Sequence, residues 1–117
     1  MDNKKQKIVE TVEAAREDLL KLSKNIHDNP ELGFEEFKAV EFISETLEKH
    51  GFSVEKGYGG LPTSFRADAK GNGDGPTVAF LAEYDALNGI GHGCGHNLIA
   101  TCAVGAFLGL SSLLDSV

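Results

Sequence analysis

Residues 77–85 read Thr77-Val78-Ala79-Phe80-Leu81-Ala82-Glu83-Tyr84-Asp85, a continuous apolar run that ends in carboxylates. A strand that is apolar on both faces is typical of the centre of a sheet covered by helices on both sides. Ligands of such sheets gather outside the carboxyl ends of the strands. The run therefore predicts a central strand over residues 77–82, with Glu83 and Asp85 at the mouth of a ligand site.

Two amphipathic helices are expected before this strand. Apolar residues recur every three or four positions over residues 5–27, and again between Phe34 and Leu47, as they do on one stripe of a helix. Pro30 interrupts the pattern and is well suited to the first turn of a new helix. Gly51 is expected to end the second helix in a left-handed conformation.

The remaining elements are predicted from short patterns and turn signals. Residues 52–55 and 63–69 are candidate strands, and the Gly-Asn-Gly-Asp-Gly-Pro sequence at 71–76 predicts a hairpin turn into the central strand. A final apolar helix is expected from near Asn97, with Cys102 in its core face. Together these elements predict an α/β fold.

Composition limits the class of protein. A length of 117 residues with 41% hydrophobic and 25% charged residues is typical of one soluble globular domain. The net charge of −7, with every basic residue at or before Lys70, argues against nucleic acid and anionic membranes as partners. The uncharged run 98–114 is short for a membrane span. Two cysteines and no apolar leader predict a cytoplasmic protein with reduced thiols.

The sequence Gly91-His92-Gly93-Cys94-Gly95-His96-Asn97 contains the densest set of metal-binding side chains. Thiolate and imidazole are preferred zinc ligands, and the alternating glycines allow the looped backbone that Cys94 and His96 need to share one metal. The alternative is a glycine-rich loop that happens to hold a buried Cys and polar histidines. A complete structural zinc site would require His27 or His50 to fold back, because no second ligand pair follows.

Asp85 is the candidate residue to orient a ligand histidine through its second ring nitrogen. Its alternative role is a helix or turn cap. Glu83, which is two positions earlier and on the same face of the predicted strand, is a weaker candidate. We find no phosphate loop, nucleophile elbow or Ser/His/Asp arrangement.

Taken together, the motifs resemble the dinuclear-metal amidohydrolases of metallopeptidase family twenty, which include aminoacylase, glutamate carboxypeptidase and aminobenzoyl-glutamate hydrolases. The resemblance extends from about residue 15 to the end of the chain. Asn88 departs from the family pattern, which usually has proline after Ala-Leu. The three matching motifs are His27-Asp28-Asn29-Pro30-Glu31-Leu32-Gly33-Phe34-Glu35-Glu36, Ala82-Glu83-Tyr84-Asp85-Ala86-Leu87 and the 91–97 sequence.

The resemblance implies an α/β catalytic domain with helices packed on a mixed sheet, interrupted in the family by a lid domain that usually mediates dimerisation. Residues 1–117 would be the N-terminal part of the catalytic domain. Cys94 and His96 would be metal ligands, Asp85 would support the site, and His92 would not be a ligand. Two divalent ions are implied, with zinc expected and manganese or cobalt as alternatives.

By the same resemblance, the function would be hydrolysis of amide bonds in N-acyl amino acids, small peptides or aminobenzoyl-glutamate-like substrates, by a homo-oligomer when full length. The family's downstream acidic pair and later histidines have no counterpart, because only Asp115 follows Asp85 among the carboxylates. We therefore expect an incomplete and inactive fragment. The alternative is a non-catalytic metal-binding or interaction module.

Overall fold

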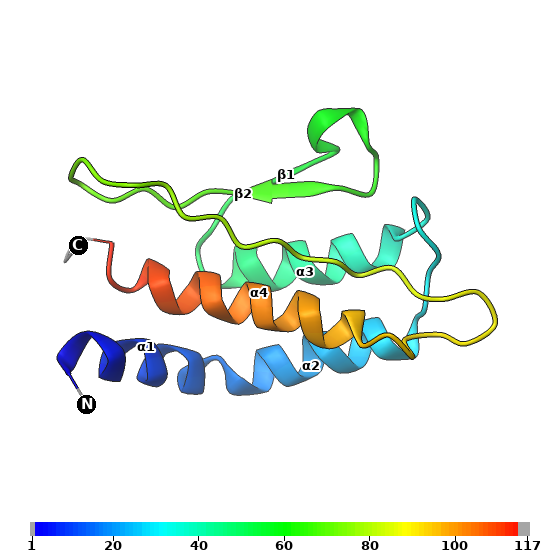
Figure 1. The fold of residues 1–117 in the computed structure, drawn as a ribbon, viewed down its shortest axis with the longest axis horizontal. Coiled ribbons are helices and arrows are strands. Elements are labelled where there is room, and N and C mark those ends of the chain that lie inside the picture. Colours follow the sequence, from blue (N-terminus) through cyan, green and yellow to red (C-terminus); the bar gives the residue numbers. More distant parts are fainter. Residues whose placement is uncertain (1, 115–117) are drawn as a thin grey trace.

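A computed structural model describes residues 2–114 of the chain. Helices form one layer, and a small antiparallel sheet lies beside α3 (Figure 1). The α/β class predicted from the sequence is confirmed. In chain order the elements are α1 Asn3–Ala14, α2 Arg16–Asp28, α3 Phe37–Lys49, β1 Val54–Lys56, the short 3-10 helix η1 Tyr58–Gly60, β2 Phe65–Ala67 and α4 His96–Ser111.

The helix predicted over residues 5–27 is divided at Ala15, which has φ −92° and ψ 3°. Its amide is shared between the carbonyls of Thr11 and Val12, so the hydrogen-bonded path bends without being lost. Ala15 is itself buried, and the bend lets both α1 and α2 follow α4. At the N-terminus, Asp2 caps α1 by accepting from the Lys5 amide at 2.9 Å.

The prediction that a helix begins at Pro30 is wrong, because α3 begins at Phe37. Residues 30–36 form an irregular loop in which Phe34 has φ +70° and is 75% exposed. The carboxylate of Glu31 accepts from the amides of Lys38 and Ala39, and so supplies the helix start from outside the helix. Gly51 follows the helix with φ +92°, as predicted.

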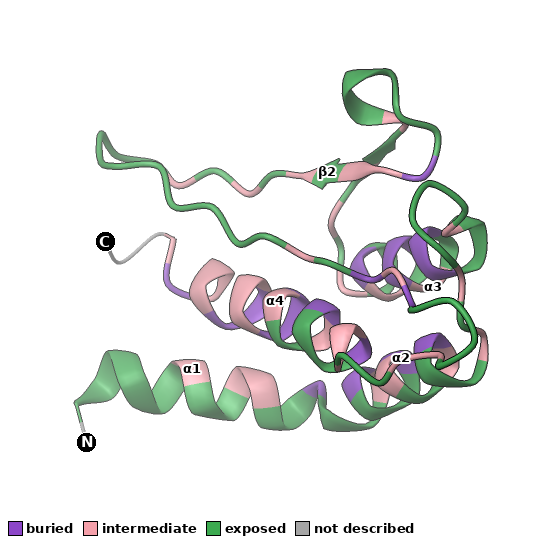
Figure 2. Ribbon diagram, turned by 45° about the vertical axis from the view of Figure 1, so that its right-hand side comes forward, coloured by how far each residue is buried: buried purple, intermediate pink, exposed green. Residues whose placement is uncertain are grey.

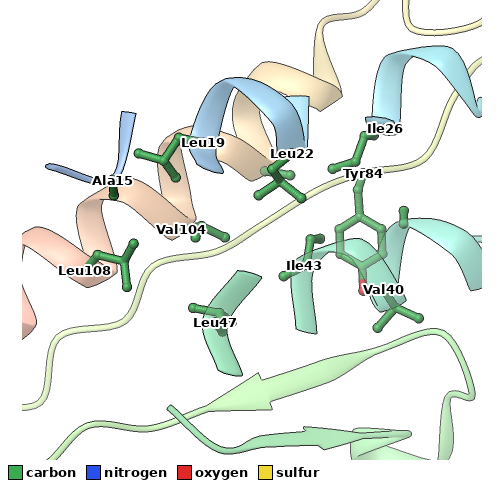
Figure 3. Packing of buried hydrophobic residues seen from close by; sticks show 12 residues of the cluster. Ala15, Leu19, Leu22, Ile26, Val40, Ile43, Leu47, Tyr84, Val104 and Leu108 are labelled. Atoms are coloured by element: carbon green, nitrogen blue, oxygen red, sulfur yellow. The ribbon is translucent and has the colours of Figure 1, made fainter. Parts of the chain in front are cut away.

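The hydrophobic core lies where α2, α3 and α4 meet (Figure 3). The stripe predicted for α3 is buried at Val40, Ile43 and Leu47, whereas Phe37 stays exposed. Burial of apolar surface at about 25 cal/mol per Å² is the main favourable contribution to holding these helices together. The other buried members are Ala15, Leu19, Leu22, Ile26, Ala39, Tyr84, Ala100, Val104 and Leu108.

The segment predicted to be the central strand is not a strand in the described part of the chain. Residues 72–81 are all exposed and run back over the helical layer without joining β1 and β2, whose antiparallel pairing ends at Ala67 (Figures 1 and 2). The 71–76 turn does reverse the chain (Figure 1). A strand forms only where neighbours take its backbone hydrogen bonds. No described residue supplies that ladder.

Cys102, predicted to lie in the core, is exposed on α4. It lines an apolar depression of about 400 Å³ together with Phe80, Leu81, Leu98 and Ile99. The helix is apolar around its circumference, and the described residues cover only the side that faces α1, α2 and α3. Within those residues, no helix is both long and apolar enough to cross a membrane.

Candidate functional site

The loop between Tyr84 and α4 is shaped by glycine. Gly89, Gly91 and Gly95 have φ values of +73°, +77° and +80°, a region that side chains with a Cβ rarely adopt. Paired backbone hydrogen bonds between Leu87 and Gly91, at 2.9 and 3.0 Å, close the loop. This folding brings the first residue of α4 back to the segment that precedes the loop.

His96 is held between two carboxylates. Its Nδ1 lies 2.8 Å from Asp85 Oδ1 and 3.0 Å from the Asp85 carbonyl oxygen, while its Nε2 lies 3.1 Å from Glu83 Oε2. The imidazole is one-fifth exposed, and it stands at the first position of α4. An Nδ1–H that donates to Asp85 fixes the ring and directs Nε2 toward Glu83. This arrangement favours a cation at Nε2, whether a proton or a metal ion.

Cys94 and His92 occupy different environments on the same loop. The Cys94 thiol is free and exposed, two positions before His96. Both ring nitrogens of His92 are buried, and among the described residues neither has a hydrogen-bond partner of normal geometry. Burial lowers the pKa of His92, and the nearby His27 and His96 lower it further, against a weaker opposite effect of Asp85 and the Ile26 backbone.

His27 lies beside the loop without joining the Asp85–His96 pair. Its ring centroid is 6.5 Å from that of His92, and its Nδ1 is 3.2 Å from Asp28 Oδ1. His50 is directed elsewhere, with Nε2 at 2.9 Å from Asp18 Oδ2. Neither histidine therefore completes a zinc site with Cys94 and His96 in this arrangement.

The donor set is suited in part to the metal that the family resemblance implies. An imidazole oriented by a carboxylate, with a thiol two residues away, is the chemistry that zinc prefers. Among residues 2–114, however, no group of three or more His, Cys, Asp or Glu side chains is gathered closely enough to hold an ion. The side chains present are suited to supplying part of a metal site.

Sequence reasoning brought Asp85, Cys94 and His96 to one loop, but it underestimated Glu83 and missed Glu31. Glu83 contacts His96 directly. Glu31 accepts two α3 amides through its side chain, and its carbonyl accepts from the Ala86 amide at 2.7 Å. Its acidic side chain ahead of an apolar stripe is a helix-start signal. Placing the helix start at Pro30 concealed it.

An α/β layer with a glycine-rich loop that joins a carboxylate-oriented histidine to a free thiol is a site of the metallohydrolase class. No family model matches the chain. Curated relatives do: it is 41% identical to the Xaa-Arg dipeptidase of Mus musculus over 97% of the chain, 36% identical to a p-aminobenzoyl-glutamate hydrolase of Escherichia coli over 92%, and 34% identical to thermostable carboxypeptidase 2 of Saccharolobus solfataricus over 88%.

The chain is therefore homologous to peptidases and amidohydrolases of metallopeptidase family twenty, and the resemblance seen in its motifs is confirmed. The chain spans between 26% and 30% of the length of these three relatives.

Proposed function

We propose that this segment is the N-terminal part of the catalytic domain of a metal-dependent amide-bond hydrolase. The observation that carries the proposal is the Asp85–His96–Glu83 contact set on the same loop as the free Cys94 thiol. The relatives are named as hydrolases, peptidases and deacetylases, which supports the same reaction class. The general base and the remaining ligands would come from other parts of the protein.

In this proposal, His96 and Cys94 are metal ligands and Asp85 is the residue that positions His96. Two divalent ions, with zinc first and manganese or cobalt as alternatives, would polarise the scissile carbonyl and lower the pKa of a bound water toward about 7. Asp85 holds the imidazole through Nδ1, so that Nε2 is the nitrogen available to an ion. His92 is excluded from the ligand set because its ring nitrogens are buried.

The proposed substrates are N-acyl amino acids, small peptides or aminobenzoyl-glutamate-like aryl amides. The relatives' names include a dipeptidase, an aminobenzoyl-glutamate hydrolase and an N-acetyl-L-cysteine deacetylase, which have in common a small amide substrate. We further propose a homo-oligomer in a reducing, cytoplasmic setting. The two free thiols support that setting.

The proposal is tested by metal content and turnover in the full-length protein. We expect Cys94→Ser and His96→Ala each to lose bound zinc or manganese together with hydrolysis of an N-acyl amino acid and dipeptide panel. His92→Ala is the matched control on the same loop, and it should keep its metal. Equal loss in all three variants, or none in the first two, would overturn the ligand assignment.

Full metal loading without turnover on any amide of the panel would favour the alternative, a non-catalytic metal-binding module. The incomplete donor set of residues 2–114 is the observation behind that alternative. Circular dichroism of each variant separates loss of metal from loss of fold.

A further inference from the structure

The loop that carries the candidate site is anchored to the rest of the molecule mainly through Pro30 and Glu31. The Ala86 amide donates to the Glu31 carbonyl at 2.7 Å, directly after Asp85. On the other side of the loop, a Cβ placed on Gly91 would lie 3.9 Å from the Pro30 Cβ, so the proline ring packs against this turn. Pro30 and Glu31 thus meet both sides of the 86–91 loop.

Glu31 is in turn fixed by its own side chain. Its Oε2 accepts from the Lys38 amide at 2.9 Å and its Oε1 from the Ala39 amide at 2.8 Å. These are two of the amides that the first turn of α3 leaves without partners inside the helix. A carboxylate at a helix N-terminus is also favoured by the helix dipole. Residue 31 is therefore attached to a rigid element, the helix that carries Ile43 and Leu47 into the core.

The consequence is a continuous path from α3 to the imidazole. The α3 amides hold the Glu31 carboxylate, the Glu31 carbonyl holds Ala86, and the adjacent Asp85 holds His96 Nδ1 through its carboxylate at 2.8 Å. Ala86 is 5% exposed, so water cannot readily replace the Glu31 carbonyl there. We propose that Glu31 is a positioning residue for the Asp85–His96 pair, acting through Ala86.

This role differs from simple helix capping. A cap that served only α3 would affect the stability of α3 and leave the geometry of His96 unchanged. Because the same residue holds α3 through its side chain and Ala86 through its carbonyl, releasing the side chain also loosens the backbone beside Asp85. A displacement of about 1 Å at a reacting group can cost about 100-fold in rate.

The test uses Glu31→Gln in the full-length protein, with the histidine rings labelled with ¹⁵N. Gln keeps the length of the side chain but replaces one acceptor oxygen with an NH₂ donor, so it cannot accept from both amides. In metal-free protein we expect the His96 ring nitrogen signals to move away from the Nδ1–H form that Asp85 stabilises. Glu31→Asp, which keeps the charge but is shorter, should give a smaller change, and it decides the question if Glu31→Gln does not fold.

Asp18→Asn is the matched control for stability. Asp18 contacts Lys49 and His50 at the opposite end of α3, so its loss weakens the attachment of α3 without touching the 84–96 segment. We expect Asp18→Asn to lower the unfolding midpoint and leave the His96 signals in place. If Glu31→Gln and Glu31→Asp destabilise α3 but leave the His96 ring spectrum unchanged, Glu31 is only a cap and the proposal is wrong.

A kinetic measurement gives a second readout, and this part rests on the proposed function. With an amide substrate, Glu31→Gln should lower kcat by about 10- to 100-fold and change KM little, as expected for a group that orients the site without touching substrate. An unchanged kcat contradicts the positioning role. Absence of turnover in the wild-type protein counts against the hydrolase proposal alone, because the ring spectrum is recorded without metal or substrate.

Discussion

At the scale of the residue, the decisive feature is a histidine with a carboxylate at each nitrogen. Asp85 at 2.8 Å from Nδ1 selects one orientation of the His96 ring, and Glu83 at 3.1 Å from Nε2 stands on the side where an ion would approach. The motif predicted the pairing of Asp85 with a histidine, because an aspartate after a strand and a histidine at a helix start recur in metal sites. Glu83 required the folded loop.

We predict that Asp85→Asn lowers metal affinity or activity of the full-length protein by about 10- to 100-fold with the fold retained, because the amide presents a neutral group to Nδ1. Isothermal titration with zinc and far-ultraviolet circular dichroism measure the two quantities. Asp68→Asn, at an exposed carboxylate paired with Arg66, is the control for a lost surface charge. Unchanged zinc affinity in Asp85→Asn would reduce Asp85 to a turn cap.

At the scale of the element, α4 depends on two glycines that differ in the space around them. A Cβ on Gly105 would meet Leu19 Cδ1 at 3.4 Å, an ordinary contact. A Cβ on Gly109 would meet Ile8 Cγ2 at 2.9 Å and Val12 Cγ2 at 3.2 Å, which are both β-branched side chains with little freedom. The sequence predicted close packing at both positions, and only the packed structure separates them.

Gly105→Ala should therefore stabilise the protein by up to about 1 kcal/mol, the helix propensity gained when Gly becomes Ala. Gly109→Ala gains the same propensity but adds an overpacking cost of about 1–3 kcal/mol where α1 meets α4. Urea unfolding of both variants gives the comparison. A Gly109→Ala protein as stable as Gly105→Ala would show that α1 moves away from α4 without cost.

The pairing of α2 with α3 should depend on acid through Asp18. The hydrogen bond from Lys49, and then that from His50, lowers the pKa of Asp18 below its usual value, with desolvation opposing them. A carboxyl whose pKa is lowered by folding contributes stability above its unfolded pKa of about 3.9, and loses it as pH falls through the folded pKa. Asp18→Asn should be less stable than wild type at neutral pH, and the two unfolding midpoints should converge below about pH 4. A difference that stays constant down to strongly acidic pH would contradict this linkage.

At the scale of the whole molecule, one face of the described chain remains apolar and uncovered. Leu81 is 85% exposed, Leu98 59% and Ile99 41%, and they adjoin the depression around Cys102. Apolar patches of this kind are rare on stable monomers and cause association. The 77–82 segment beside it presents backbone groups that no described strand pairs, which adds an edge open to pairing.

We predict that the 117-residue chain, expressed by itself, has no amide hydrolase activity and self-associates. General acid-base assistance alone is worth about 100- to 10,000-fold, and the missing ligands remove the activated water as well. Turnover of N-acyl amino acids and dipeptides is measured beside the full-length protein, and association by sedimentation. Turnover within about tenfold of full length, and abolished by Cys94→Ser, would show a complete site in this chain, since that deficit is smaller than the acid-base contribution alone.

Sequence alone determined the helical stripes, the turn at 71–76, the start of α4 and the family, because each depends on local periodicity, glycine conformation or a contiguous motif. Tertiary structure decided the rest. The α3 start moved to Phe37 because a side chain from outside the helix supplies its cap, and residues 77–82 are not a strand because strand pairing depends on neighbours. Likewise, Glu83 and Glu31 gained their roles only when the loop brought distant segments into contact.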